Sequence, residues 1–117
     1  MKDSLLDRAI RLAAEAHAGQ TEKNGSPYVL HPLRLMFKMH NEVEMAAAVL
    51  HDVIEDTDLT LEKLTAEGFP SDLVQAVDCL TRRPGELYLR YVRRAAGNPV
   101  ARRVKLADLE DNLDLRR

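Results

Sequence analysis

Hydrophobic residues recur every three or four positions along most of the chain, which is the spacing of amphipathic helices. The first stripe covers residues 5–16, where Asp3 or Ser4 is placed to cap the start of a helix. Residues 42–54 are so rich in alanine, methionine, valine and leucine that we expect the most buried helix there. Further helices are predicted to begin near Pro32 and Thr60 and to cover 71–81, 86–96 and 100–115.

Polar segments interrupt this helical pattern. Residues 20–28 contain an Asn-Gly pair and a proline, which predicts a loop. An Asn-Gly pair can close a β-hairpin, but no alternating strand follows it here. The pair Asn98-Pro99 separates the last two predicted helices. We therefore expect an all-α fold, a bundle of about six to seven helices that forms a single domain over residues 1–117.

The charge is unevenly distributed in a composition that is otherwise ordinary for a globular protein, with 45% hydrophobic and 31% charged residues. The net charge is only −2, but residues 1–81 contain seven basic and fourteen acidic side chains, whereas residues 82–105 contain eight basic side chains and one acidic. The basic segment suits an anionic ligand. Nucleic acid is the weakest candidate, because no recognition motif accompanies the charge and the pI is about 6.1.

Cys79 is the only cysteine, so the chain cannot form an internal disulfide or build a thiolate metal site by itself. A reducing, cytoplasmic compartment is therefore expected. The first residues lack the apolar core of a signal peptide, and no stretch approaches the roughly 18 consecutive apolar residues of a membrane span. We expect no membrane partner.

The most reactive group of side chains lies at the end of the most apolar segment. His51-Asp52 directly follows the run 46–50, and on a continuous helix His51 would share a face with Glu55, as Asp52 would with Asp56. A charged group at the end of a buried helix is costly without a partner. One imidazole and three carboxylates within about a turn therefore indicate a metal or catalytic site to which other elements contribute.

Two other elements offer suitable metal ligands. His31 precedes Pro32 at the start of a different predicted helix, and Asp108 follows an apolar step in the last one. With His51 and Asp52 they make two imidazoles and two carboxylates, a mixed nitrogen and oxygen set suited to Mn²⁺, Fe²⁺ or Zn²⁺. Such an ion would lower the pKa of a bound water and make it a nucleophile.

Four motifs occur in order along the chain: Ala16–Gln20 (AHAGQ), Pro27–Pro32 (PYVLHP), Leu50–Thr57 (LHDVIEDT) and Val104–Asp108 (VKLAD), followed by Asn112. Together, over residues 9–114, they resemble the hydrolase domain of the RelA/SpoT family, a branch of the HD metal-dependent phosphohydrolases. The stand-alone small alarmone hydrolases, including metazoan SpoT homologues, share the same core. The resemblance implies the all-helical HD fold, in agreement with the hydrophobic pattern.

The resemblance also implies an activity, the removal of pyrophosphate from the 3′ position of guanosine tetra- or pentaphosphate, (p)ppGpp. The implied ion is Mn²⁺, with Fe²⁺, Zn²⁺ or Co²⁺ as alternatives. The implied metal ligands are His31, His51, Asp52 and Asp108, and the implied water-activating acids are Glu55 and Asp56. The nucleotide pocket is matched by Lys23, Tyr28 and Asn112. Phosphate contacts are expected from the basic segment, through Lys105, Arg90, Arg94, Arg102 or Arg103.

The chain departs from the family pattern in the loop before His31. Family members usually have Arg-Lys where this chain has Glu22-Lys23, and an acid cannot replace an arginine that packs against guanine. Two alternatives therefore stay open: an HD phosphohydrolase of another nucleotide, and a catalytically degenerate nucleotide-binding module. Family members also continue with more helix beyond Asn112, so we expect a domain that is minimal or truncated at its C-terminus. The oligomeric state stays open.

Overall fold

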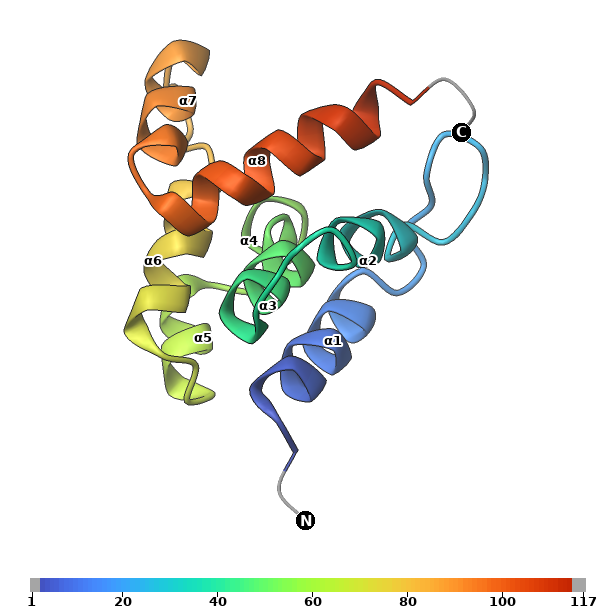
Figure 1. Cartoon of the computed structure of the whole chain (residues 1–117). Helices are drawn as coiled ribbons and strands as arrows, with labels where there is room; N and C mark the ends of the chain where they lie inside the picture. The colour runs from blue at the N-terminus through green and yellow to red at the C-terminus, as the bar shows by residue number, and fades with distance from the viewer. Residues whose placement is uncertain (1–2, 115–117) are drawn as a thin grey trace.

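The computed structural model describes residues 3–114, and within that range its regular structure is helical apart from one isolated β-bridge. The helices, shown in Figure 1, are α1 (Leu5–Ala16), α2 (Leu30–Met36), α3 (Glu42–Leu50), α4 (Val53–Asp56), α5 (Leu61–Ala66), α6 (Ser71–Cys79), α7 (Tyr88–Ala96) and α8 (Pro99–Asn112). The predicted all-α fold is confirmed. The predicted end of the last helix, at residue 115, lies outside the described residues. No helix within 3–114 combines the length and the apolar character needed to cross a lipid bilayer.

Capping residues explain where the helices start. At α1, the Ser4 hydroxyl accepts a hydrogen bond from the Asp7 N–H at 3.0 Å, and the Asp7 carboxylate accepts one from the Ser4 N–H at 3.2 Å. Asn98 caps α8 by accepting from the Ala101 N–H at 2.9 Å, with Pro99 in the first turn. These contacts satisfy backbone donors that a helix start leaves unpaired. Both starts agree with the sequence pattern.

Helix α3 forms the centre of the molecule. Residues 46–50 are completely buried, as expected for the most apolar segment of the chain. In Figure 1, α3 lies between α1 and α2 on one side and α6 on the other, and α8 crosses it. Removing this apolar run from water is the driving force that gathers the other helices around α3. Residues at the ends of α3, α2 and α8 are thereby brought together.

The segment predicted as one helix over 42–54 is divided in the structure. Helix α3 ends before His51 and α4 begins after Asp52. The His51 N–H bonds to the Ala48 carbonyl, three residues back, at 3.4 Å, and Asp52 has φ −106° and ψ −1°. The pairing of His51 with Glu55 that a continuous helix would produce therefore does not apply, and the chain turns at the two residues expected to carry the chemistry.

The loop over 20–28 is closed by a tight turn. The Gly25 N–H donates to the Glu22 carbonyl at 2.9 Å, and Gly25 has a φ of +87°, in the left-handed region that glycine adopts without steric cost. An isolated bridge between Thr21 and Pro27 joins the two sides of the loop. The predicted loop is confirmed, and its second side leads directly into α2.

Candidate functional site

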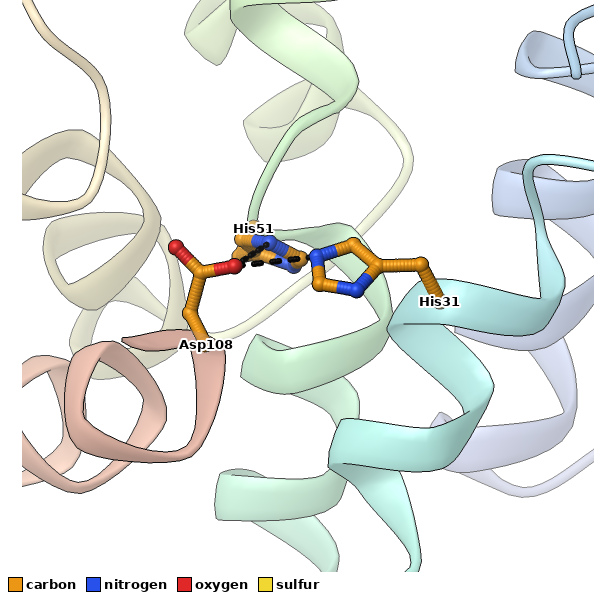
Figure 2. Close-up of side chains that lie close together, drawn as sticks. All are labelled: His31, His51 and Asp108. Carbon is orange, nitrogen blue, oxygen red and sulfur yellow. Dashed lines mark hydrogen bonds and ion pairs between the residues drawn. The ribbon is translucent and has the colours of Figure 1, made fainter. Parts of the chain in front are cut away.

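Three buried side chains from different parts of the chain meet at one point. His31 lies in the first turn of α2, His51 directly follows α3, and Asp108 lies in α8. His31 Nε2 is 2.9 Å from Asp108 Oδ1, and His51 Nε2 is 3.6 Å from the same oxygen. Figure 2 shows both imidazoles turned toward that carboxylate. One nitrogen or oxygen of each residue lies within 4.8 Å of the others, a spacing at which they could hold one metal ion.

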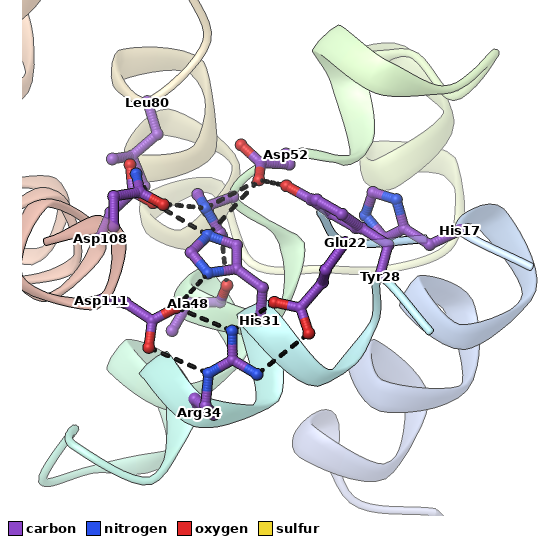
Figure 3. Close-up of polar contacts among 12 residues, drawn as sticks. His17, Glu22, Tyr28, His31, Arg34, Ala48, Asp52, Leu80, Asp108 and Asp111 are labelled. Atoms are coloured by element: carbon purple, nitrogen blue, oxygen red, sulfur yellow. Dashed lines mark hydrogen bonds and ion pairs between the residues drawn. The ribbon is translucent and has the colours of Figure 1, made fainter. Parts of the chain in front are cut away.

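Asp52 brings a second carboxylate to this point. Its Oδ2 is 3.0 Å from His51 Nε2 and 4.0 Å from His31 Nε2. The Tyr28 hydroxyl donates a hydrogen bond to the same Asp52 oxygen (Figure 3). All four residues that the sequence predicts as metal ligands therefore lie together, with Asp52 as the fourth.

The environment of the His51 ring nitrogens suits the binding of a cation between His51 and the carboxylates of Asp52 and Asp108. His51 Nδ1 donates to the Ala48 carbonyl at 2.8 Å, so whenever the ring is neutral its lone pair is on Nε2. This Nε2 is buried and has no hydrogen-bond partner among the described residues. A buried lone pair that faces carboxylate oxygens is unfavourable unless a positive charge lies between them. A metal ion would supply that charge.

The electrostatics of the site also favour a cation. Burial opposes a charge on His51, but attraction to Asp52 and Asp108 outweighs burial and raises the pKa of His51 to about 10. Burial acts to raise the pKa of Asp108, yet its contacts with His31, His51 and Lys105 hold that pKa well below the usual range. The carboxylates therefore stay ionised, and in the metal-free protein a proton on His51 balances them.

The His31 nitrogen that points away from Asp108 contacts Asp111, a residue that was not predicted from the sequence. This nitrogen, Nδ1, is 2.6 Å from Oδ2 of Asp111, a buried carboxylate in α8. Nε2 of the same ring is 2.9 Å from Asp108 Oδ1, so both ring nitrogens of His31 face carboxylates. With a metal ion bound at Nε2, the single N–H of the neutral imidazole would lie on Nδ1 and donate to Asp111. Asp111 follows Asp108 by three residues and shares its helix face, which is the sequence signal that could have identified it.

Glu55 and Asp56 lie exposed at the end of α4. The Glu55 carboxylate accepts a hydrogen bond from the Arg82 backbone N–H. Although both residues are exposed, their carboxyl groups are partly covered by neighbouring atoms. This partial loss of solvent raises the pKa of Glu55 despite the Arg82 N–H, and together with the nearby Asp52 it raises the pKa of Asp56. A carboxylate with a raised pKa is a stronger base than an ordinary one, which suits it to proton transfer.

A pocket of about 460 Å³ opens beside the meeting point. Three of the predicted nucleotide-binding residues line it: Lys23, Tyr28 and Asn112. Asn112 Nδ2 is 3.4 Å from Asp108 Oδ1, so this residue borders both the pocket and the histidine–carboxylate group. The pocket is thus formed by the loop over 20–28 on one side and the end of α8 on the other.

The basic segment 82–105 contributes less to the site than its charge suggests. Lys105 lies beside it, with Nζ 3.3 Å from Asp108 Oδ2, but it is not part of the pocket lining. Arg94 and Arg103 already form ion pairs, with acids that lie outside the pocket. Within the described part of the chain, Lys105 is the residue of this segment that contacts the histidine–carboxylate group.

Comparisons with known proteins place these residues in a family. The family model described as "HD domain" matches residues 9–108. A guanosine-3′,5′-bis(diphosphate) 3′-pyrophosphohydrolase of Aquifex aeolicus (strain VF5) is 32% identical over 120 residues, which cover 92% of this chain and 17% of the relative. A probable GTP pyrophosphokinase of Mycobacterium leprae (strain TN) is 31% identical over 123 residues, which cover 94% of this chain and 16% of the relative. The chain therefore spans about a sixth of the length of these curated relatives.

A solved structure has the same fold. It is described as a metazoan orthologue of SpoT that hydrolyses ppGpp, and it matches with a TM-score of 0.77 and 27% identity over 97% of this chain and 70% of that one. The likeness covers the helices that bring the two histidines and the two aspartates together. Since the family model matches most of the chain, the chain belongs to the HD-domain family, and its relatives include the (p)ppGpp pyrophosphohydrolases of the RelA/SpoT group.

Proposed function

We propose that this chain is a metal-dependent phosphohydrolase that removes pyrophosphate from the 3′ position of (p)ppGpp. The observation that carries the proposal is the meeting of two histidines and two aspartates beside an open pocket, with the buried Nε2 of His51 facing carboxylates. The names of the Aquifex relative and of the metazoan SpoT structure support this reaction. A reducing cytoplasm, where the free Cys79 stays a thiol, fits a nucleotide substrate.

The residues that would hold the metal ion are His31, His51, Asp52 and Asp108. Two imidazoles and two carboxylates suit Mn²⁺, our first choice, and also Fe²⁺, Zn²⁺ or Co²⁺. Such an ion, when bound, polarises a phosphoryl oxygen and lowers the pKa of water.

Glu55 and Asp56 would manage the proton of the attacking water. Asp56 lines the pocket, and the pKa of each carboxyl is raised. The water oxygen forms a bond to the phosphorus next to the ribose 3′ oxygen, and the bond between that phosphorus and the 3′ oxygen breaks. One carboxylate accepts a proton from the water, and the 3′ oxygen takes up a proton as it leaves. The products are pyrophosphate and GDP, or GTP from the pentaphosphate.

The charge of the pocket explains why a polyphosphate would need cations to bind. Six carboxylates belong to its lining: Glu22, Asp52, Asp56, Asp108, Asp111 and Asp114. Lys23 lines the same pocket, and Lys105 lies on the other side of Asp108. Substrate phosphates would be repelled by this lining unless a metal ion and these lysines offset the repulsion. We therefore assign substrate contacts to the four residues predicted for that role: Lys23, Tyr28, Lys105 and Asn112.

Glu22 favours a second candidate, hydrolysis of a different nucleotide. Its carboxylate lines the pocket and forms an ion pair with Arg34. The pairing offsets the repulsion of phosphate, but it leaves an acid at the place where the family resemblance expects an arginine against guanine. The pocket could then accept another base.

The test is a hydrolysis assay on the metal-depleted chain, with and without added Mn²⁺. Release of pyrophosphate from ppGpp that depends on Mn²⁺ supports the proposal, and faster hydrolysis of another nucleoside polyphosphate supports the second candidate. Tight ppGpp binding without turnover, in protein shown to contain one metal ion per chain, would instead identify a nucleotide-binding module and overturn both.

A further inference from the structure

Three charged side chains, Glu22, Arg34 and Asp111, form a row of contacts that leads from the loop over 20–28 to His31 Nδ1. The Arg34 guanidinium donates to Asp111 from Nε and from Nη2, each at 3.0 Å, and its other edge donates to Glu22, from Nη1 at 3.2 Å and from Nη2. Asp111 Oδ2 in turn lies 2.6 Å from His31 Nδ1. Figure 3 shows Arg34 between the two carboxylates, with the His31 ring beyond Asp111.

The row joins three separate elements with a repeated spacing. On α2, Arg34 follows His31 by three residues, and on α8, Asp111 follows Asp108 by three residues. Residues three apart share a helix face, so each of the two helices presents one residue of the proposed metal centre and one residue of the row. The third element is the loop over 20–28, which contributes Glu22, 12 positions before Arg34.

The two carboxylates of the row, Glu22 and Asp111, are largely buried, so their partners must be charged and well oriented. The Asp111 side chain is 3% exposed and the Glu22 side chain 14% exposed, so each carboxylate needs a compensating charge. The fork of an arginine holds a carboxylate by two parallel hydrogen bonds and fixes its plane, which an ammonium group cannot do. With both Asp111 oxygens held by Arg34, Oδ2 stays directed at His31 Nδ1.

The Arg34 guanidinium also occupies the position where a metal ion could otherwise bind to Glu22, His31 and Asp111. Glu22, His31 and Asp111 form a second group whose ligand atoms lie within 4.8 Å of one another. The guanidinium supplies the positive charge for the two carboxylates of this group, with hydrogen bonds to both. A metal ion would therefore find the two carboxylates of the Asp111 group already bound by a guanidinium, whereas Asp108 and Asp52 face the buried imidazole nitrogens of His31 and His51.

We propose that Glu22, Arg34 and Asp111 are positioning residues for the metal centre. They hold His31 in the tautomer that presents Nε2 to the ion, and they tie the pocket loop to that histidine. This inference rests on the proposed metal centre of the preceding subsection. Partners of metal-binding histidines typically change metal affinity about 10–100-fold when they are removed. The effect should decrease with distance from His31 along the row.

The experiment measures Mn²⁺ affinity by calorimetry on the full chain. We expect Asp111→Asn to weaken binding by about 10–100-fold, Arg34→Lys to weaken it less because the charge remains without the fork, and Glu22→Gln to weaken it least. The matched control is Arg103→Lys, which alters the ion pair of Arg103 with the buried Glu44 between α8 and α3. Its Mn²⁺ affinity should equal that of the unmodified chain.

A second readout separates positioning from a merely structural role. The visible absorption spectrum of the Co²⁺-loaded chain reports the geometry of the ligands, and it should change in Asp111→Asn and Arg34→Lys but not in Arg103→Lys. Equal Mn²⁺ affinities and unchanged Co²⁺ spectra in both row variants would reject the positioning role while leaving the metal centre intact. Should Asp111→Asn fail to fold, Arg34→Lys decides the matter alone. An unmodified chain that binds no divalent ion would overturn the proposed metal centre together with this inference.

Discussion

The hydroxyl of Tyr28 donates a hydrogen bond to Oδ2 of Asp52, the oxygen that lies 3.0 Å from His51 Nε2. Tyr28 belongs to the second motif and Asp52 to the third, 24 positions later. A residue predicted to border the nucleotide therefore also orients a proposed metal ligand. The pocket loop controls two ligands in this way: Asp52 through Tyr28, and His31 through the row that begins at Glu22.

Replacing Tyr28 by phenylalanine tests the first of these contacts. The ring remains, but Asp52 loses a donor, and a hydrogen bond to a charged group contributes about 1.5 kcal/mol or more. We expect Tyr28→Phe to weaken Mn²⁺ binding by about tenfold or more, measured by calorimetry. Tyr88→Phe is the control, because Tyr88 is half-exposed on α7. Unchanged metal affinity with a raised KM would show that Tyr28 serves the substrate instead.

Removing His51 should abolish metal binding and activity together. Its Nε2 faces both carboxylates of the site, and Nδ1 is already used by the Ala48 carbonyl. The loss of metal affinity in His51→Ala should exceed the roughly 10–100-fold that loss of a ligand's hydrogen-bond partner costs. Metal content by mass spectrometry and pyrophosphate release are measured on the same sample. His40→Ala, at an exposed histidine, should behave like the unmodified chain.

Glu55→Gln should separate turnover from metal binding. The amide can still accept from the Arg82 N–H, but it cannot take a proton from water. Loss of a general base typically lowers kcat by about 10²–10⁴-fold. Metal content should remain that of the unmodified chain, and Glu62→Gln, at an exposed acid of α5, should leave both unchanged. Normal hydrolysis by Glu55→Gln would move the catalytic role to Asp56.

The pH dependence of metal binding follows from His51. In the metal-free protein its pKa is raised from 6.5 to about 10, so a metal ion must displace a proton from Nε2 at any lower pH. Between pH 7 and 9 we expect about one proton to be released per ion and the affinity to rise about tenfold per pH unit. Calorimetry in buffers of different ionisation enthalpy measures the released proton. A pH-independent affinity over this range would contradict the assignment.

The same shift makes a separate prediction for stability. Because the folded pKa of His51 lies above the unfolded value, the protonated form stabilises the metal-free fold fully below pH 6.5, and this contribution is lost as the pH rises toward about 10. Thermal unfolding of metal-depleted protein should therefore show a falling Tm between pH 7 and 9. Saturation with Mn²⁺ should remove that decline, since the ion replaces the proton.

Much of the fold could be predicted from the sequence because its causes are local. The spacing of apolar residues identified the helical segments, Asp3 or Ser4 was expected to cap the first of them, and the pair Asn98-Pro99 marked the boundary before the last. The caps that Ser4 and Asn98 form are hydrogen bonds that span only three residues. The run 46–50 was recognisable as the centre of the fold because its composition allows burial on every side. The order of the four motifs nominated the residues that meet beside the pocket, although their role as metal ligands remains a proposal.

Tertiary structure decided what depends on contacts between distant residues. The 42–54 segment is divided at His51, whose side chain reaches Asp108, 57 positions later, and no local pattern indicates either the break or the contact. The spacing of Asp111 from Asp108 could have drawn attention to it, but no local pattern indicates that it pairs with Arg34, 77 positions away, or that it contacts His31. Local sequence specifies backbone conformation through short-range hydrogen bonds and apolar spacing. The partner of a buried charge is instead chosen by packing, because only the folded chain brings the compensating group within reach.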